Sequence, residues 1–145
     1  MKKLLTLAFA AIAMSLCACS KDDENGANEK NGLVGTWEVY KVVCEYGRYT
    51  EIDDEYGEGS GYRDIYEFRD GGIGENKYME YNYGRWVTDY YPFTYKLDGS
   101  TLRMTSGGES QIMTIEKLTT SELIWMEQYR DDDDYEIYRT YLKRI

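Results

Sequence analysis

The side chains that could do chemistry in this chain are carboxylates, tyrosines, lysines and serines, because the sequence has no histidine. Without histidine, neither a Ser-His-Asp triad nor a Cys-His pair can form, and the commonest ligand of transition metals is missing. The three cysteines are too few for a Cys₄ zinc site, and a Cys₂His₂ site is excluded as well. We therefore predict no cofactor and no transition-metal centre.

Acidic residues are abundant, with 27 against 17 lysines and arginines, for a net charge of −10. Such a charge argues against a nucleic-acid partner, since nucleic-acid binding needs a basic surface that displaces counterions. Two carboxylates can hydrolyse a glycosidic bond, but no pair stands out, so we predict that the protein is not an enzyme. The run Asp131 to Asp134 could hold calcium. It lacks a turn glycine and alternating ligands, so we interpret it as a charged turn.

Two groups of aromatic residues are the candidate ligand-binding residues. The first lies in the longest connection, Glu45 to Gly61, and the second follows it; the members are Tyr46, Tyr49, Tyr56, Trp86, Tyr90 and Tyr91. Flat rings can stack on a sugar or a lipid, and Asp53, Asp54 and Asp89 could accept hydrogen bonds from hydroxyls. Long connections are often functional. Two other interpretations stay open: the connection is a solvated acidic hairpin rather than a lid, and the second group belongs to the wall or core.

The start of the chain has the layout of a secretory signal, with Lys2 and Lys3 before the apolar run Leu4 to Leu16. About a dozen apolar residues are too few to span a hydrocarbon core of roughly 30 Å as a helix. The run ends in Leu-Cys-Ala-Cys, which has the form of a lipobox with its cysteine at position 19. We therefore predict a lipoprotein signal peptide over residues 1–18, cleavage after Ala18 and acylation of Cys19, which attaches the protein to a membrane.

Residues 19–32 then form a lipidated, flexible, acidic tether, because they contain almost nothing apolar that could offset the entropy of ordering. The sequence Ser-Lys-Asp-Asp-Glu after Cys19 resembles the acidic export signal of surface-exposed Bacteroidetes lipoproteins. This resemblance implies a lipid-anchored protein of the outer membrane, displayed on the cell surface, with the inner leaflet of that membrane as the alternative. After cleavage Cys44 is the only free cysteine, so no internal disulfide can form.

Residues 33–145 are predicted to form one all-β domain of about eight short antiparallel strands without a convincing helix. The expected strands are 33–44, 62–68, 73–83, 85–89, 92–97, 101–105, 111–118, 122–129 and 135–145, with 85–97 either one bent strand or a pair. Turn sequences such as Arg69 to Gly72 and Asp98-Gly99 separate them. An up-and-down barrel removes open sheet edges, and a β-sandwich is the alternative. In the first strand simple alternation places Trp37, Val39 and Val43 on one face and Tyr40, Val42 and Cys44 on the other.

The order of several short motifs resembles the lipocalin-like domain of Bacteroidetes lipoproteins over nearly all of residues 33–145. The motifs are Leu33-Val34-Gly35-Thr36-Trp37, Phe68-Arg69-Asp70-Gly71-Gly72, the stretch from Phe93 to Leu102, and the stretch from Ile115 to Leu123. The resemblance implies an eight-stranded barrel that is closed at one end and has an internal cavity. It also implies that Trp37 packs at the closed end beneath Arg139 or Arg144.

These observations favour a surface-anchored, lipocalin-like barrel that binds a small apolar or glycan ligand. The alternative is a filled barrel that serves as a protein-interaction or accessory module of the outer membrane. An internal cavity would favour the ligand-binding barrel, whereas a large exposed aromatic patch on a filled barrel would favour the interaction module. The sequence leaves the oligomeric state open.

Overall fold

The computed structural model describes residues 32–54, 56–57, 59–131 and 134–145. The predicted signal peptide, Cys19 and almost the whole tether therefore lie outside the described residues. Within these ranges, no helical segment has the length and hydropathy that a membrane crossing requires.

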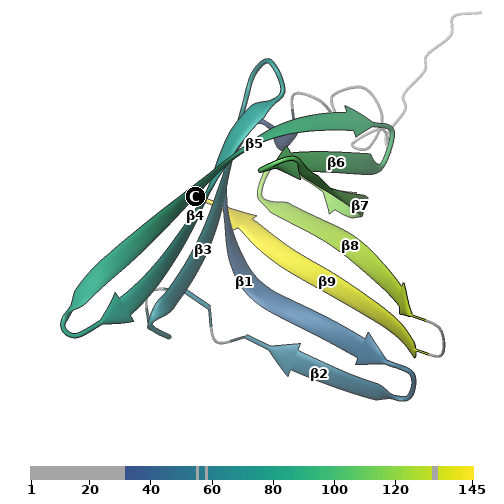
Figure 1. Cartoon of the computed structure of the whole chain (residues 1–145), viewed down its shortest axis with the longest axis horizontal. Coiled ribbons are helices and arrows are strands. Elements are labelled where there is room, and N and C mark those ends of the chain that lie inside the picture. The colour runs from purple at the N-terminus through teal and green to yellow at the C-terminus, as the bar shows by residue number, and fades with distance from the viewer. Residues whose placement is uncertain (1–31, 55, 58, 132–133) are drawn as a thin grey trace, which may run out of the picture.

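The described chain folds into antiparallel strands that run up and down in sequence order (Figure 1). Their bounds are β1 (Gly35–Tyr46), β2 (Tyr49–Asp53), β3 (Tyr62–Arg69), β4 (Ile73–Asn82), β5 (Arg85–Asp98), β6 (Thr101–Ser106), β7 (Glu109–Leu118), β8 (Glu122–Asp131) and β9 (Asp134–Arg144). Eight of these nine strands, all except β2, close into a barrel through the pairing of β1 with β9. The predicted eight-stranded antiparallel barrel is confirmed, and the β-sandwich alternative is wrong.

The additional strand β2 comes from the long first connection of the chain. It forms a hairpin with the second half of β1, in which Tyr46 pairs with Tyr49 and Val42 with Asp53. β3 pairs with the first half of β1, so β2 and β3 occupy the same side of β1 at different heights. All five residues of β2 are exposed. This part of the connection therefore extends the wall of the barrel as an acidic hairpin.

A β-bulge between Val39 and Lys41 corrects the predicted faces of the first strand. A bulge inserts one extra residue and so reverses the alternation beyond it. Val42 consequently faces the interior together with Val39, and Cys44 is buried as well. The placement of Val42 and Cys44 on the face opposite to Trp37 and Val39 was wrong, because simple alternation cannot foresee a bulge.

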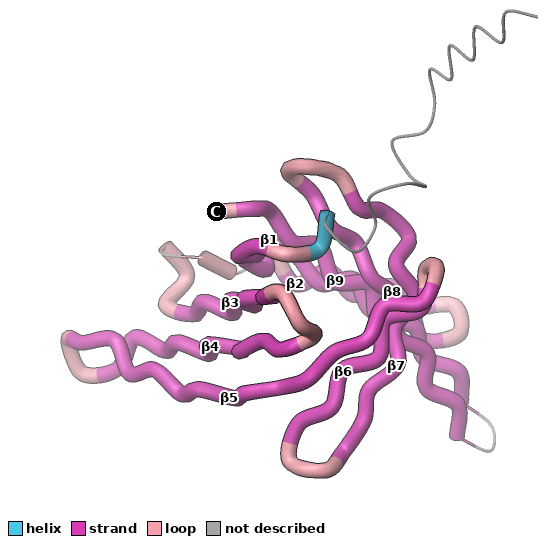
Figure 2. The backbone as a smooth tube through the Cα atoms, turned by 90° about the horizontal axis from the view of Figure 1, so that it is seen from above, coloured by secondary structure: helices cyan, strands magenta, loops and turns pink. Residues whose placement is uncertain are grey.

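The barrel opens at one end because two pairs of neighbouring strands, β5 with β6 and β7 with β8, are hydrogen-bonded over only part of their length. β5 is one continuous strand, but β6 pairs only with its last five residues, Thr94–Asp98. β7 likewise pairs with β8 only between Thr114 and Leu118. Figures 1 and 2 show the β4–β5 hairpin diverging from β6 and β7 at this end. The result is a flared mouth above a narrower barrel.

The opposite end of the barrel is closed around Trp37, which is fully buried. Its indole Nε1 donates a hydrogen bond to the Leu33 carbonyl at 2.8 Å. Apolar residues from seven strands pack around it, and the buried cluster contains Leu33, Val39, Phe68, Phe93, Leu97, Leu102, Met104, Met113, Leu123, Trp125 and Leu142. This cluster is the core that supports the cavity above it.

Arg144 is the arginine that stacks on Trp37, with its Cζ 4.2 Å from the ring centroid. It also donates hydrogen bonds to three backbone carbonyls, those of Gly32, Val34 and Thr120. Gly35 allows this close approach: its φ is +143°, and a Cβ at that position would collide with Arg144 Nη1. The other arginine considered, Arg139, forms ion pairs with Glu45 and Glu116 instead.

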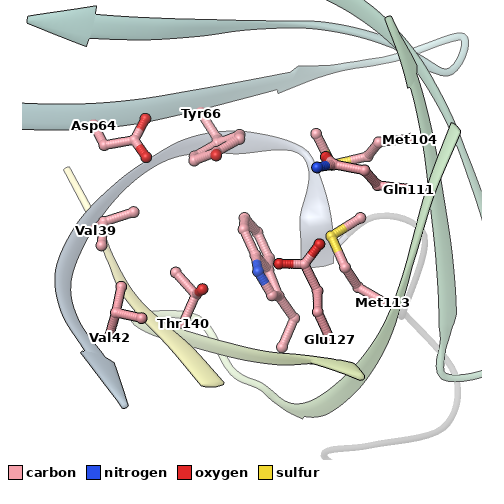
Figure 3. Close-up of a pocket in the computed structure, with 10 residues that line it drawn as sticks. Val39, Val42, Asp64, Tyr66, Met104, Gln111, Met113, Glu127 and Thr140 are labelled. Atoms are coloured by element: carbon pink, nitrogen blue, oxygen red, sulfur yellow. The ribbon is translucent and has the colours of Figure 1, made fainter. Parts of the chain in front are cut away.

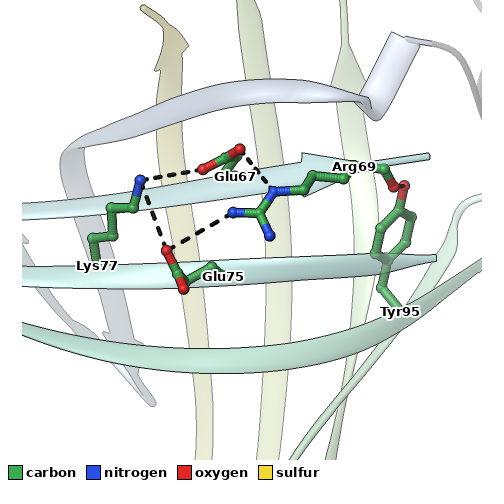
Figure 4. A network of polar contacts seen from close by, with 5 residues as sticks. All are labelled: Glu67, Arg69, Glu75, Lys77 and Tyr95. Atoms are coloured by element: carbon green, nitrogen blue, oxygen red, sulfur yellow. Dashed lines mark hydrogen bonds and ion pairs between the residues drawn. The ribbon is translucent and has the colours of Figure 1, made fainter. Parts of the chain in front are cut away.

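The outer face of β3 and β4 carries a network of ion pairs (Figure 4). Glu67 accepts hydrogen bonds from Arg69 Nε at 2.8 Å and Lys77 Nζ at 3.2 Å, and Glu75 lies 3.9 and 3.8 Å from the same two cations. The hydrogen bonds from Arg69 and Lys77 lower the pKa of Glu67 to about 2. The Tyr95 hydroxyl donates to the Arg69 carbonyl at 2.7 Å, which links β5 to the same pair of strands.

Candidate ligand-binding cavity

A cavity of about 100 Å³ lies inside the barrel between the closed end and the mouth (Figure 3). Six strands contribute to its wall, and the lining residues are Val39, Val42, Asp64, Tyr66, Met104, Gln111, Met113, Trp125, Glu127 and Thr140. Strand alternation explains this selection, since inward positions recur at every second residue. In β8, for example, Leu123 belongs to the core alone, Trp125 belongs to the core and also reaches the cavity, and Glu127 lines the cavity.

The deep part of the cavity is apolar and aromatic. Trp125, Met113 and Met104 are buried, with exposed fractions of 3%, 2% and 7%. The rings of Tyr66 and Trp125 meet edge to face, with centroids 5.1 Å apart and an interplanar angle of 88°. Gln111 is exposed and lies where the lining reaches the surface. The cavity therefore has a rigid aromatic floor and a polar rim.

Asp64 is the first of two carboxylates that line the cavity. Its Oδ1 accepts a hydrogen bond from Asn76 Nδ2 at 2.5 Å, and Asn76 also donates to the Ile65 carbonyl at 3.3 Å. Burial raises the pKa of Asp64, although hydrogen bonds from Asn76 and Tyr66 act in the opposite direction. The desolvation of the charged form is therefore only partly compensated by the protein.

Glu127 is the second carboxylate, and it reaches the cavity from β8. Burial raises the pKa of its carboxyl group as well, and among the described residues a hydrogen bond from Tyr129 opposes this shift. That bond is long, 3.4 Å from the Tyr129 hydroxyl to Oε1. Among the described residues, no lysine or arginine forms an ion pair with either Asp64 or Glu127.

The phenol groups near the cavity respond to the same two carboxylates. Burial raises the pKa of Tyr66 well above its usual value, and the charges of Asp64 and Glu127 raise it further. Burial, followed by the charges of Asp53 and Asp64, raises the pKa of Tyr56 to about 12. Both phenols are therefore neutral at physiological pH, and the cavity carries negative charge when its carboxylates are ionised.

The three tyrosines predicted in the first connection lie in different surroundings. Tyr46 is at the end of β1, where its ring meets Tyr138 edge to face at 6.5 Å. Tyr49, at the start of β2, is 79% exposed. Tyr56 is half-buried and packs against the core cluster. The structure therefore does not gather these three side chains into one binding surface.

The second aromatic group is divided between the two faces of β5. Trp86 is paired with Tyr81 on β4, and their rings meet at 5.4 Å. Tyr91 is paired with Asn76 and lies two residues before the buried Phe93, so it shares the inner face of the wall. Tyr90 lies on the opposite face, and both tyrosines are at least half exposed, at 59% and 50%.

The residues that line the cavity were not among the candidates predicted from the sequence. Those candidates are aromatic residues that lie close together in the sequence, whereas the cavity is formed by the side chains at inward positions on six strands. A usable signal was present in 62–68, where Asp64, Tyr66 and Phe68 alternate on one face. A carboxylate on a core-facing strand position is unusual, and that position marks the site.

Metal binding finds no support in the described residues, where no group of three or more acidic or cysteine side chains is arranged to hold an ion. The alternative calcium site at Asp131 to Asp134 involves side chains outside the described part of the chain. Cys44 is buried and free.

Comparison with known proteins places these observations in a family context. The profile of the lipocalin-like domain family matches residues 33–125. Lobster apocrustacyanin A1 has a similar structure, with a TM-score of 0.51 and 12% identity over 81% of this chain and 63% of its own. Apocrustacyanin C2 gives a TM-score of 0.51 and 14% identity over 85% of this chain and 69% of its own. The chain therefore spans about 63% of the length of apocrustacyanin A1. No curated protein sequence matches the chain.

Proposed function

This chain belongs to the lipocalin-like domain family, and from that premise we propose that it is a lipid-anchored binding protein that takes part of a small ligand into its barrel. The single observation that carries the proposal is the internal cavity, which lies above a closed, tightly packed end and below a flared mouth. A filled barrel that acts only through its surface would have no such space.

The size of the cavity limits what can enter it. Pockets that bury a whole drug-sized ligand have volumes of roughly 300–1,000 Å³, whereas this one measures about 100 Å³. An engineered apolar cavity of about 150 Å³ holds benzene. We therefore propose that the cavity receives one small ring or a short chain, and that the rest of the ligand lies in the mouth.

The mouth offers surfaces for the remainder of such a ligand. On the inner face of the wall, Tyr91 is half exposed because β6 does not pair with this part of β5. Tyr62 and Tyr78 lie close together on β3 and β4, with ring centroids 6.5 Å apart. These rings can cover an apolar body or one face of a sugar, so both ligand classes predicted from the sequence remain within the proposal.

Binding accounts for the cavity better than catalysis does. Asp64 and Glu127 are the pair of carboxylates that a glycosidase mechanism would require. Such a mechanism also needs space for a distorted sugar ring and, in inverting enzymes, for an attacking water. A cavity of about 100 Å³ lined by methionine, valine and aromatic residues does not offer that space. We therefore propose a non-enzymatic role, and we expect no hydrolysis of nitrophenyl glycosides.

The proposed anchor rests on the sequence between Leu16 and Cys19. It predicts that cells expressing the full chain incorporate labelled palmitate into the protein, and that the Cys19→Ala variant loses the label. Digestion of intact cells with proteinase K then tests the location. Loss of the protein from intact cells supports surface display, whereas protection until the outer membrane is opened supports the inner leaflet.

Native mass spectrometry of the full chain, purified from membranes in mild detergent, tests the binding proposal directly. A bound molecule of defined mass is expected after incubation with lipid and glycan extracts. Thr140→Met should abolish the adduct, because Thr140 is buried in the cavity wall and the longer side chain fills the space. The matched control is Thr114→Met, whose side chain is exposed on β7. Equal adducts in both variants would contradict binding in the cavity.

A further inference from the structure

The charge of the cavity points to a particular class of ligand. Resting on the proposed function, we infer that the cavity selects organic cations, with the ammonium group of a small amine held by Asp64 and Glu127 and its apolar body placed against Trp125 and Tyr66. A cavity of the same size with neutral walls would take any apolar fragment. This cavity should instead discriminate between ligands of the same size by their charge.

The charge balance at the cavity wall favours a cationic ligand. Two carboxylates line a space of about 100 Å³, and no lysine or arginine is among the lining residues. Asp64 receives hydrogen bonds from Asn76 and Tyr66, and Glu127 receives one long bond from Tyr129. All of these partners are neutral groups. Both carboxylates are partly buried, and charges that are removed from water are normally paired. A cationic ligand can supply the partner that the cavity wall lacks.

The aromatic and thioether side chains beside the carboxylates also favour a cationic ligand. Tyr66 lines the cavity together with both carboxylates, and the charges of Asp64 and Glu127 raise the pKa of its phenol. Figure 3 shows Asp64 next to Tyr66 on one side of the cavity and Glu127 on another side. An aromatic face attracts an ammonium group through its quadrupole, and the edge-to-face arrangement with Trp125 presents two rings at nearly a right angle.

The protein does not fully stabilise the charged form of either carboxylate. Burial raises the pKa of both carboxyl groups, which means that the protein alone does not fully compensate their charge. The titratable groups whose pKa responds to the charge of Asp64 are the phenols of Tyr66, Tyr56 and Tyr78. The phenols that respond to the charge of Glu127 are those of Tyr66 and Tyr129. None of these groups becomes positive on protonation. An incoming ammonium group would be the first positive charge at the site.

The same charges exclude a large group of apolar molecules. A fatty acid or another amphiphile with a carboxylate would bring a third negative charge into the cavity, at a position where like charges are poorly screened. The net charge of −10 adds a weaker, long-range preference of the same sign. Neutral apolar molecules stand between these two cases, because they gain the aromatic contacts but leave the carboxylates unpaired.

Three probes of similar size separate these cases: benzylamine, benzyl alcohol and benzoate. Each is titrated calorimetrically at pH 8 into the full chain in detergent, with empty micelles as the blank. We expect benzylamine to bind at least about tenfold more tightly than benzyl alcohol, since charge-assisted hydrogen bonds are stronger than neutral ones. Benzoate should not bind measurably.

The carboxylates are tested with Asp64→Asn and Glu127→Gln, which keep the shape of each side chain and remove its charge. Each variant should lose most of the preference for benzylamine over benzyl alcohol, and a cooperative urea transition like that of the parent protein shows that the barrel is folded. Asp98→Asn is the matched control, because Asp98 is exposed at the closed end of β5. That variant changes the net charge equally and should bind like the parent protein.

The outcomes distinguish this inference from the proposed function. If benzyl alcohol binds as tightly as benzylamine, or if both carboxylate variants keep the preference for the amine, cation selectivity is overturned and the cavity stays a binding site for neutral groups. If none of the three probes binds the parent protein, the cavity does not admit a benzene-sized group, and the proposed function fails together with the inference.

Discussion

Replacing Arg144 by methionine should remove the main polar support of the closed end of the barrel. In the native protein its guanidinium group donates to three backbone carbonyls and lies over the indole ring of Trp37. Methionine preserves much of the apolar contact with Trp37 but supplies no donor. The change therefore isolates the hydrogen bonds and the cation–π contact from the packing of the stem.

The expected loss can be worked out contact by contact. The carbonyl of Thr120 is exposed and can return to water, so its bond contributes little. The two part-buried bonds, to Val34 and Gly32, should contribute about 1–1.5 kcal/mol each. The cation–π contact adds about 0.5–1 kcal/mol at a partly exposed site. The sum is about 3 kcal/mol, a large fraction of the roughly 5–15 kcal/mol that stabilises a domain.

Urea unfolding followed by tryptophan fluorescence measures this loss. Arg144→Lys should recover only part of it, because an ammonium group retains the charge but lacks the planar fork that reaches several carbonyls. Arg103→Met is the matched control, since Arg103 is exposed on β6, and its effect should stay within about 0.5 kcal/mol. A loss below about 1 kcal/mol for Arg144→Met, or full recovery with lysine, would refute the assignment of stability to these bonds.

Three further predictions concern the same closed end and the cavity. Gly35→Ala should destabilise the fold by about 2 kcal/mol or more, because alanine is strained at a φ of +143° and its Cβ displaces Arg144; in urea titrations, the double variant with Arg144→Met should lose less than the sum of the single losses. Asp64→Asn and Glu127→Gln should each be more stable than the parent protein at pH 8 without ligand. Burial raises both pKa values, so the stability that these groups contribute is present at acid pH and lost as the pH rises through the folded-state pKa; urea midpoints that fall in the variants at pH 8 would contradict this. The affinity for benzylamine should fall as the pH is lowered from 8 to 4, beginning above the usual carboxyl range, while that for benzyl alcohol stays constant; calorimetry at each pH checks both curves.

Local turn chemistry explains why the strands could be predicted from the sequence. Asp98-Gly99 and the turn from Arg69 to Gly72 connect strands as expected, and Gly99, Gly71 and Gly72 all have positive φ values. These signals depend on residues that are adjacent in sequence. The closure of the barrel then followed, because consecutive antiparallel strands with inward apolar positions have few other ways to remove their edges.

The features that the sequence did not reveal depend on partners far along the chain. The bulge after Val39 exists because β1 must pair with β9, more than 90 residues away, while keeping Val42 and Cys44 inside. Without the bulge, the inward set of β1 cannot be assigned, and the cavity wall cannot be assembled from sequence alone. The aromatic candidates such as Tyr90 and Tyr91 were grouped as neighbours, although adjacent strand residues face opposite sides.

The contacts that stabilise the fold are concentrated at the closed end of the barrel, and the candidate site lies next to them on the side of the mouth. At the closed end, buried apolar side chains and the contacts of Arg144 satisfy nearly every group, and the fully buried residues Trp37, Leu123 and Leu142 lie there. Four residues along β8 from Leu123 and two along β9 from Leu142, the same strands carry Glu127 and Thr140 into the cavity. The Glu127 carboxylate there forms no ion pair among the described residues. A barrel selected for stability alone would fill this level with apolar side chains, as it does one level below. Charged groups at a position that costs folding free energy are expected at functional sites, and they support the proposal that a ligand supplies the missing partner.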